Sequence, residues 1–143
     1  MAKAMKVEVS LPITEDGEIT RSPNTPQEAA MALVVLLGLY EQRQSAYRDA
    51  VDEFYAHDAK GKLIEVECIE ELISGGTTKT DAGKLAKVQP KYLTWQDTQH
   101  VLAKKRDDAD TALSIARRRA DTMTTMAHIL FGGGAPTRDW GNN

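Results

Sequence analysis

Apolar side chains recur every seven residues along two long stretches of this chain. The first series consists of Leu33, Tyr40, Tyr47 and Phe54. The second series consists of Trp95, Leu102, Ala109, Ala116, Met123 and Leu130. A seven-residue repeat places its members along one side of an α-helix. Both stretches are therefore predicted to be long helices that meet along a coiled-coil-like seam, with bulky residues on the first helix and small residues on the second.

Local capping signals predict where the two long helices begin and end. The first is expected to start in the segment Thr-Pro-Gln-Glu at 25–28, with the threonine as N-cap and the glutamate as its reciprocal capping-box partner. It is expected to end near 60–61, where Gly follows Lys. The second is expected over 93–131 and stops at the glycines 132–134.

The segments outside the long helices are shorter and more polar. Residues 5–20 alternate between apolar and polar side chains, which predicts a short strand, a hairpin or an extended arm. A short acidic helix is favoured over a strand for 62–73. Another short helix is expected to be capped by Thr80 or Asp81 and to reach Gln89.

Together these elements predict an all-α protein, built as a long antiparallel helical hairpin with a short N-terminal β arm. The predicted divisions are the arm (1–24), the hairpin domain (25–131) and a flexible, polar C-terminal tail (132–143) that contains Trp140. A single hairpin leaves aliphatic residues such as Val35 uncovered, so we expect the protein to form a homo-oligomer.

Charge is distributed unevenly, although the net charge of the chain is only −3. Residues 1–78 contain 7 Lys and Arg against 14 Asp and Glu, whereas residues 79–119 contain 10 against 5. Lysine and arginine neutralise phosphates, and aromatic rings stack on bases, so a basic segment with aromatic residues favours single-stranded DNA as a partner. The candidate contact residues are Lys84, Lys87, Lys91, Tyr92, Trp95, Lys104, Lys105 and Arg106.

A second interpretation needs only the charges of the chain itself. Lys104–Arg106 is followed at once by Asp107 and Asp108, and Trp95 also belongs to the seven-residue series of the seam. The basic stretch would then pair with acidic residues of the first half, namely Glu65, Glu67, Glu70 and Glu71. In that case the protein is a structural or assembly component, of a virion or scaffold, that binds only protein.

No catalytic or metal-binding pattern is evident, so we expect a protein that is not an enzyme and has no metal or cofactor. The three histidines are scattered, and adjacent carboxylates such as Glu70 and Glu71 point to different sides of a helix. The segment Gly-Gly-Thr-Thr-Lys-Thr at 75–80 is only superficially similar to a phosphate-binding loop, because no strand is predicted before it.

The sequence also favours a cytoplasmic protein with no membrane partner. The longest apolar run, 29–39, has 11 residues and is too short to span a bilayer. No signal peptide is evident, and Cys68 is the only cysteine, so an internal disulfide is excluded.

The order of aromatic, basic and helical segments resembles the UvsY-like recombination mediators of tailed phages. The resemblance rests on the aromatic residues in 47–55, the lysine-rich segment 80–91 and the long terminal helix over 92–130. It implies a ring-like oligomer that binds single-stranded DNA and helps to load a recombinase onto strands coated by a single-strand-binding protein. The partners expected from this resemblance are single-stranded DNA, further copies of the chain, and a recombinase or single-strand-binding protein.

Overall fold

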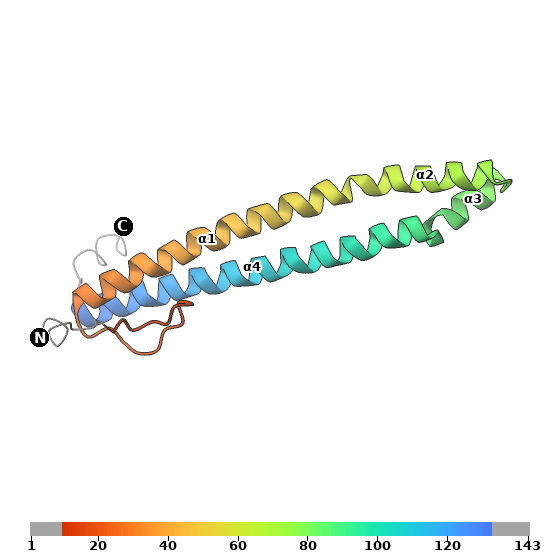
Figure 1. The fold of residues 1–143 in the computed structure, drawn as a ribbon. Coiled ribbons are helices and arrows are strands. Elements are labelled where there is room, and N and C mark those ends of the chain that lie inside the picture. Colours follow the sequence, from red (N-terminus) through yellow and green to blue (C-terminus); the bar gives the residue numbers. More distant parts are fainter. Residues whose placement is uncertain (1–9, 133–143) are drawn as a thin grey trace, which may run out of the picture. The chain divides into compact units, whose positions relative to one another are not determined.

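The computed structural model describes residues 10–132 of the chain (Figure 1). Their helices, in chain order, are α1 (Pro26–Asp58), α2 (Lys60–Ser74), α3 (Lys79–Leu85), the short 3-10 helix η2 (Ala86–Val88) and α4 (Pro90–Phe131). Within this described part no strand occurs, so the prediction of an all-α protein is confirmed for it. Residues 1–9 and 133–143, including Trp140 of the predicted tail, lie outside the described residues.

The N-terminus of α1 is capped by the predicted threonine but not by the predicted reciprocal bond. Thr25 Oγ1 accepts a hydrogen bond from the backbone N–H of Glu28 at 3.1 Å. The Glu28 carboxylate accepts from the backbone N–H of Asn24 at 2.9 Å and from Arg21 Nη1 at 2.8 Å. The glutamate therefore ties the start of α1 to the residues before it, one position earlier than a capping box requires.

The acidic helix predicted over 62–73 is confirmed as α2, while two of the other helix starts differ from the prediction. The cap of α3 is Thr78, whose Oγ1 accepts from the backbone N–H of Asp81 at 3.2 Å. Pro90 begins α4, three residues before the predicted start at 93, because a proline at the first helical position lacks only an N–H that would have no helical partner. Gly132, with φ +80°, follows the last residue of α4 as predicted.

The chain divides into two compact units. Unit 1 contains the described residues up to Gln44 together with those from Ala112 onwards, and unit 2 contains Ser45–Thr111. Helices α1 and α4 each contribute residues to both units.

The core of unit 1 lies between antiparallel segments of α1 and α4 (Figure 1). Ala32 and Leu36 of α1 pack with Ala120 and Met123 of α4. Each helix therefore supplies one alanine and one large side chain, which corrects the prediction of a bulky first helix against a small second one. The predicted series on α1 is displaced from the seam, since Leu33 is only partly buried at the edge of this core.

Residues 10–25 fold back onto unit 1 and contain no strand. A single antiparallel bridge joins Ile13 and Ile19, and both side chains pack against the core. The turn between them passes through Gly17, whose φ of +88° favours glycine. Arg119 Nη1 donates to the backbone oxygen of Asp16 at 3.0 Å. The predicted β arm is thus not found over 10–20, where the chain packs on its own helices, and the rest of that prediction lies outside the described residues.

Unit 2 is organised around Trp95 of α4. The indole Nε1 donates to the backbone oxygen of His57 at 2.9 Å, and the two rings stack with centroids 5.5 Å apart and an interplanar angle of 6°. Gly61 of α2 leaves room for the indole, because a Cβ there would lie 2.5 Å from Trp95 Cζ2. Buried Gln99 bonds His57 Nδ1 at 2.6 Å and donates to Asp58 Oδ1 at 2.9 Å. These contacts hold the partly buried Trp95 ring against α1 and α2 within unit 2.

Candidate nucleic-acid interface

All eight residues predicted to contact nucleic acid belong to unit 2, but the structure does not gather them at one place. Lys84 lies on α3, Lys87 on η2, and the other six lie on α4. Within α4, Lys104 follows Lys91 by 13 residues, which corresponds to about 20 Å along the helix axis. The candidates therefore form two groups, one around the start of α4 and one at 104–106.

The cations at 104–106 have acidic or aromatic partners within unit 2. Lys105 Nζ lies 2.7 Å from Glu53 Oε1, and Lys104 Nζ lies 2.8 Å from Asp108 Oδ2. The hydrogen bond to Asp108 raises the pKa of Lys104 above its ordinary value. Arg106 pairs with Asp107 at 3.2 Å and stands 4.2 Å above the centre of the Phe54 ring. The three positive charges at 104–106 are therefore already paired with acidic residues of the same chain.

Lys91 is held between two acidic side chains of α2. Its Nζ lies 3.2 Å from Glu71 Oε1 and 3.3 Å from Glu67 Oε1. The hydrogen bonds to Glu71 and then to Glu67 raise the pKa of Lys91, because they stabilise its charged form. This is the pairing between basic and acidic segments that the second interpretation predicts, and it involves two of the four named glutamates.

The two aromatic candidates differ in what they can offer to a base. Trp95 has its N–H bonded to His57 and stacks on the imidazole of that residue. Tyr92 is half-buried, with its ring centroid 5.3 Å from that of Trp95. Tyr92 is therefore the better placed of the two for stacking on a nucleobase.

Three exposed lysines of α3 and η2 differ from Lys91 and the cations at 104–106 in having no acidic partner among the described residues. Lys79, Lys84 and Lys87 make no side-chain hydrogen bond or ion pair with any described residue. Asp81 is the one acidic residue in 79–89. Lys79 was not among the predicted contact residues, although its place in the basic segment was the available signal. These three residues, which we call the α3–η2 lysines, are exposed and combine two of the predicted contact residues with Lys79.

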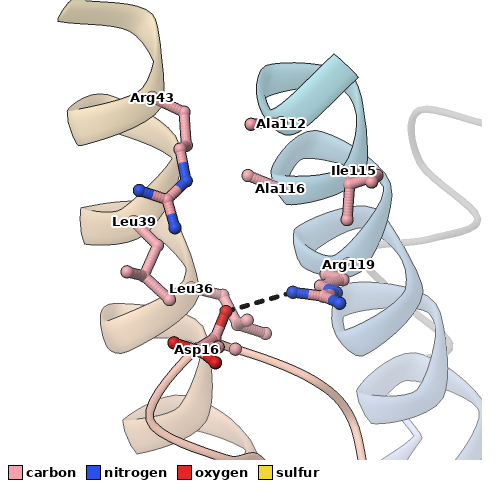
Figure 2. A pocket seen from close by; sticks show the side chains of 9 residues that line it. Asp16, Leu36, Leu39, Arg43, Ala112, Ile115, Ala116 and Arg119 are labelled. Atoms are coloured by element: carbon pink, nitrogen blue, oxygen red, sulfur yellow. Dashed lines mark hydrogen bonds between the residues drawn. The ribbon is translucent and has the colours of Figure 1, made fainter. Parts of the chain in front are cut away.

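Unit 1 contains a cavity of about 170 Å³ that the sequence analysis did not identify (Figure 2). Its lining comes from the turn before α1, from α1 and from α4, and consists of Asp16, Gly17, Leu36, Leu39, Arg43, Ala112, Ile115, Ala116 and Arg119. Figure 2 shows the guanidinium groups of Arg43 and Arg119 directed from the two helices toward the space between them. Such a cavity could not be predicted because its walls are far apart in the sequence.

The described residues hold no group of three or more His, Cys, Asp or Glu side chains suited to a metal ion. The glycine-rich segment at 75–80 connects α2 to α3, with Gly76 at φ +102°, so a helix precedes it where a phosphate-binding loop has a strand. Among the helices of 10–132, none combines the length and apolar character needed to cross a membrane.

Comparison of the chain with protein-family models, with curated proteins and with solved structures finds no match. The resemblance to UvsY-like mediators therefore stays a prediction.

Proposed function

We propose that the protein is a non-enzymatic accessory factor that binds single-stranded DNA through the α3–η2 lysines. The observation that carries this proposal is the presence of three exposed lysines without acidic partners in the nine residues 79–87. Tyr92, at the start of α4, adds a half-buried aromatic ring a few residues further along. Lysines for phosphates and an aromatic ring for a base are the combination that single strands require.

The paired cations are secondary contacts in this proposal. The side chains of Lys91, Lys104 and Lys105 are 46%, 78% and 60% exposed, respectively. Exposed ion pairs contribute only about 0–1 kcal/mol, so a DNA phosphate can compete with the carboxylates for these lysines. The α3–η2 lysines need no such exchange, and we expect them to dominate the affinity.

The order of segments that resembles UvsY-like mediators supports a role in recombinase loading for the same protein. The expected partners are then a recombinase or a single-strand-binding protein, in addition to the DNA strand itself. Localisation in the cytoplasm, where such a reaction takes place, is part of the same proposal.

Binding of a fluorescently labelled single-stranded oligonucleotide, followed by anisotropy at several salt concentrations, tests this function. Each phosphate contact on a single strand contributes a slope of about −0.7 in log K against log salt, so three contacts predict a slope near −2. A duplex of the same length serves as the control and is expected to bind more weakly. Absence of binding to the single strand at low salt would reject the proposal.

A second candidate function, assembly through protein contacts alone, is favoured by the exposed side of α1 in unit 1. Residues 29–40 contain no charged side chain, yet only one side of the helix there is covered. The uncovered side chains include Val34 at 72% exposure, with Met31 and Leu37 each at 47%. A helix that is apolar on all sides is normally buried on all sides. This surface, the outer face of α1 (Met31, Val34, Val35, Leu37 and Gly38), supports self-association whether or not DNA is bound.

A further inference from the structure

The outer face of α1 has a polar residue at each end. Gln27 precedes Val34 by seven residues, and Glu41 follows it by seven. Seven residues are close to two turns, so all three lie on the same side of the helix. Gln27 and Glu41 are exposed, and neither side chain makes a hydrogen bond or ion pair with a described residue. The apolar face is therefore bounded by an amide at one end and by a carboxylate at the other.

The carboxylate of Glu41 determines how a second copy can pack on this face. In a parallel pair of α1 helices in register, the two Glu41 side chains would lie side by side and repel each other. In an antiparallel pair, Glu41 lies beside the second copy's Gln27, whose amide can donate to it. Gln27 is in the first turn of α1, where the helix dipole also favours a carboxylate. The other charges of that turn, Glu28 and Arg21, are already paired with each other at 2.8 Å.

The register of an antiparallel pair follows from the apolar residues. The uncharged stretch 29–40 has its midpoint between residues 34 and 35, so full overlap of two such stretches brings the two copies of Val34 together. Met31 then lies opposite the second copy's Leu37, and Ala30 lies opposite the second copy's Gly38. A Cβ at Gly38 would have nothing within 4 Å, so the face is open there to a neighbouring helix. Large side chains thus meet large ones and small residues meet small ones.

We propose that a second copy of the chain covers the outer face of α1, with the two α1 helices antiparallel and related by a two-fold axis near Val34. The proposal rests on the self-association proposed above and adds its orientation and register. Both copies use the same surface, so the contact is complete with two copies, unlike a head-to-tail contact that builds a ring. The contact residues belong to unit 1 and the α3–η2 lysines to unit 2, so each dimer carries two sets of these lysines.

Disulfide cross-linking of the full chain distinguishes the two orientations. Ala30→Cys and Gly38→Cys are oxidised separately and as an equal mixture, and the products are separated on a non-reducing gel. In the antiparallel pair the two copies of position 38 are about 12 Å apart along the helix axis, which is too far for a disulfide. We therefore expect a covalent dimer from the mixture and none from either variant alone. The wild type is the control, because its only cysteine, Cys68, is buried.

Opposite substitutions of Gln27 give a second measurement of the same arrangement. Gln27→Lys places a cation beside the second copy's Glu41, and Gln27→Glu places a carboxylate there. Each contact occurs twice in a two-fold dimer, so we expect the dimer dissociation constant from sedimentation equilibrium to fall about fivefold for the first variant and to rise about fivefold for the second. In a parallel pair Gln27 lies opposite its own copy, and both variants would raise the constant.

The outcomes separate this proposal from the one on which it rests. Cross-linking of Gly38→Cys alone, or a dissociation constant raised by both Gln27 variants, would overturn the antiparallel arrangement and leave self-association intact. A protein that sediments as a dimer but gives no covalent product from the mixture would overturn the register. A wild-type protein that stays monomeric would reject self-association itself, and this proposal with it.

Discussion

Trp95 fits two patterns in the sequence, and only the structure separates them. It belongs to the seven-residue series of the second long helix and also to a segment rich in lysine. In the structure its indole is bonded to and stacked on His57, and it fills the space above Gly61. The helical periodicity was the better guide here because it reports packing between helices, and the partly buried Trp95 packs on α1 and α2, whereas the basic neighbours report only composition. Of the two aromatic candidates, only Tyr92 is still proposed to stack on a base of single-stranded DNA.

Substitution of Gly61 by alanine is expected to destabilise the protein by about 1–3 kcal/mol, because the new methyl group overlaps the Trp95 ring. The ring cannot move aside freely, since its N–H and one face are engaged by His57. Gly83→Ala is the control: it lies in α3 with nothing within 4 Å of its added Cβ, and alanine favours a helix by up to about 1 kcal/mol. Urea unfolding followed by circular dichroism should therefore show a lower free energy of unfolding for Gly61→Ala and a higher one for Gly83→Ala than for the wild type. If both variants are stabilised, Trp95 does not pack on Gly61.

At the scale of elements, the helices were predictable because their signals are local. Apolar periodicity identified α1 and α4, and the choice of helix over strand for 62–73 was correct for α2. The caps were predicted less well. The Glu28 carboxylate was expected to accept from the backbone of Thr25, but it accepts from Arg21 and from the backbone of Asn24. Pairing between elements, such as Lys105 with Glu53 across 52 residues, depends on how the helices pack and is not encoded in any local pattern.

The start of α1 predicts a pH dependence that can be tested through Glu28. Hydrogen bonds from Arg21 and from the Asn24 backbone to its carboxylate lower the pKa of Glu28 below the ordinary value of 4.5. A lowered pKa contributes stability that is present above the unfolded-state value and is lost as the pH falls through the folded-state value. We expect Glu28→Gln to be less stable than the wild type at pH 7 and to approach it at pH 3, as measured by thermal unfolding. An unchanged difference between the two proteins at both pH values would contradict this role.

At the scale of the whole molecule, the uneven charge of the sequence is partly neutralised inside unit 2. Lys91 with Glu67 and Glu71, and Lys105 with Glu53, join the basic segment to acidic residues of the first half. The sequence predicted both this pairing and an open basic surface as alternatives, and the structure contains some of each. Net charge could not decide between them because it does not specify which side chains meet.

Self-association through the outer face of α1 predicts different effects for two matched substitutions. Val34 is 72% exposed on this face, and Val101 is 66% exposed on α4 in unit 2. Val34→Glu places a charge in the proposed contact and is expected to lower the mass found by sedimentation, whereas Val101→Glu leaves it unchanged. A wild-type protein that sediments at the monomer mass of 15.7 kDa at micromolar concentration would refute self-association.

Binding of single-stranded DNA by two triple variants of equal charge tests the central claim most directly. One variant replaces the unpaired lysines Lys79, Lys84 and Lys87 by alanine, and the other replaces the paired lysines Lys91, Lys104 and Lys105. If the α3–η2 lysines hold the strand, the first variant weakens binding to all sequences alike and flattens the salt slope by about two units. The second variant should change the slope by less than half as much. Equal losses in the two variants would show that affinity follows net charge alone and would contradict a defined interface on α3 and η2.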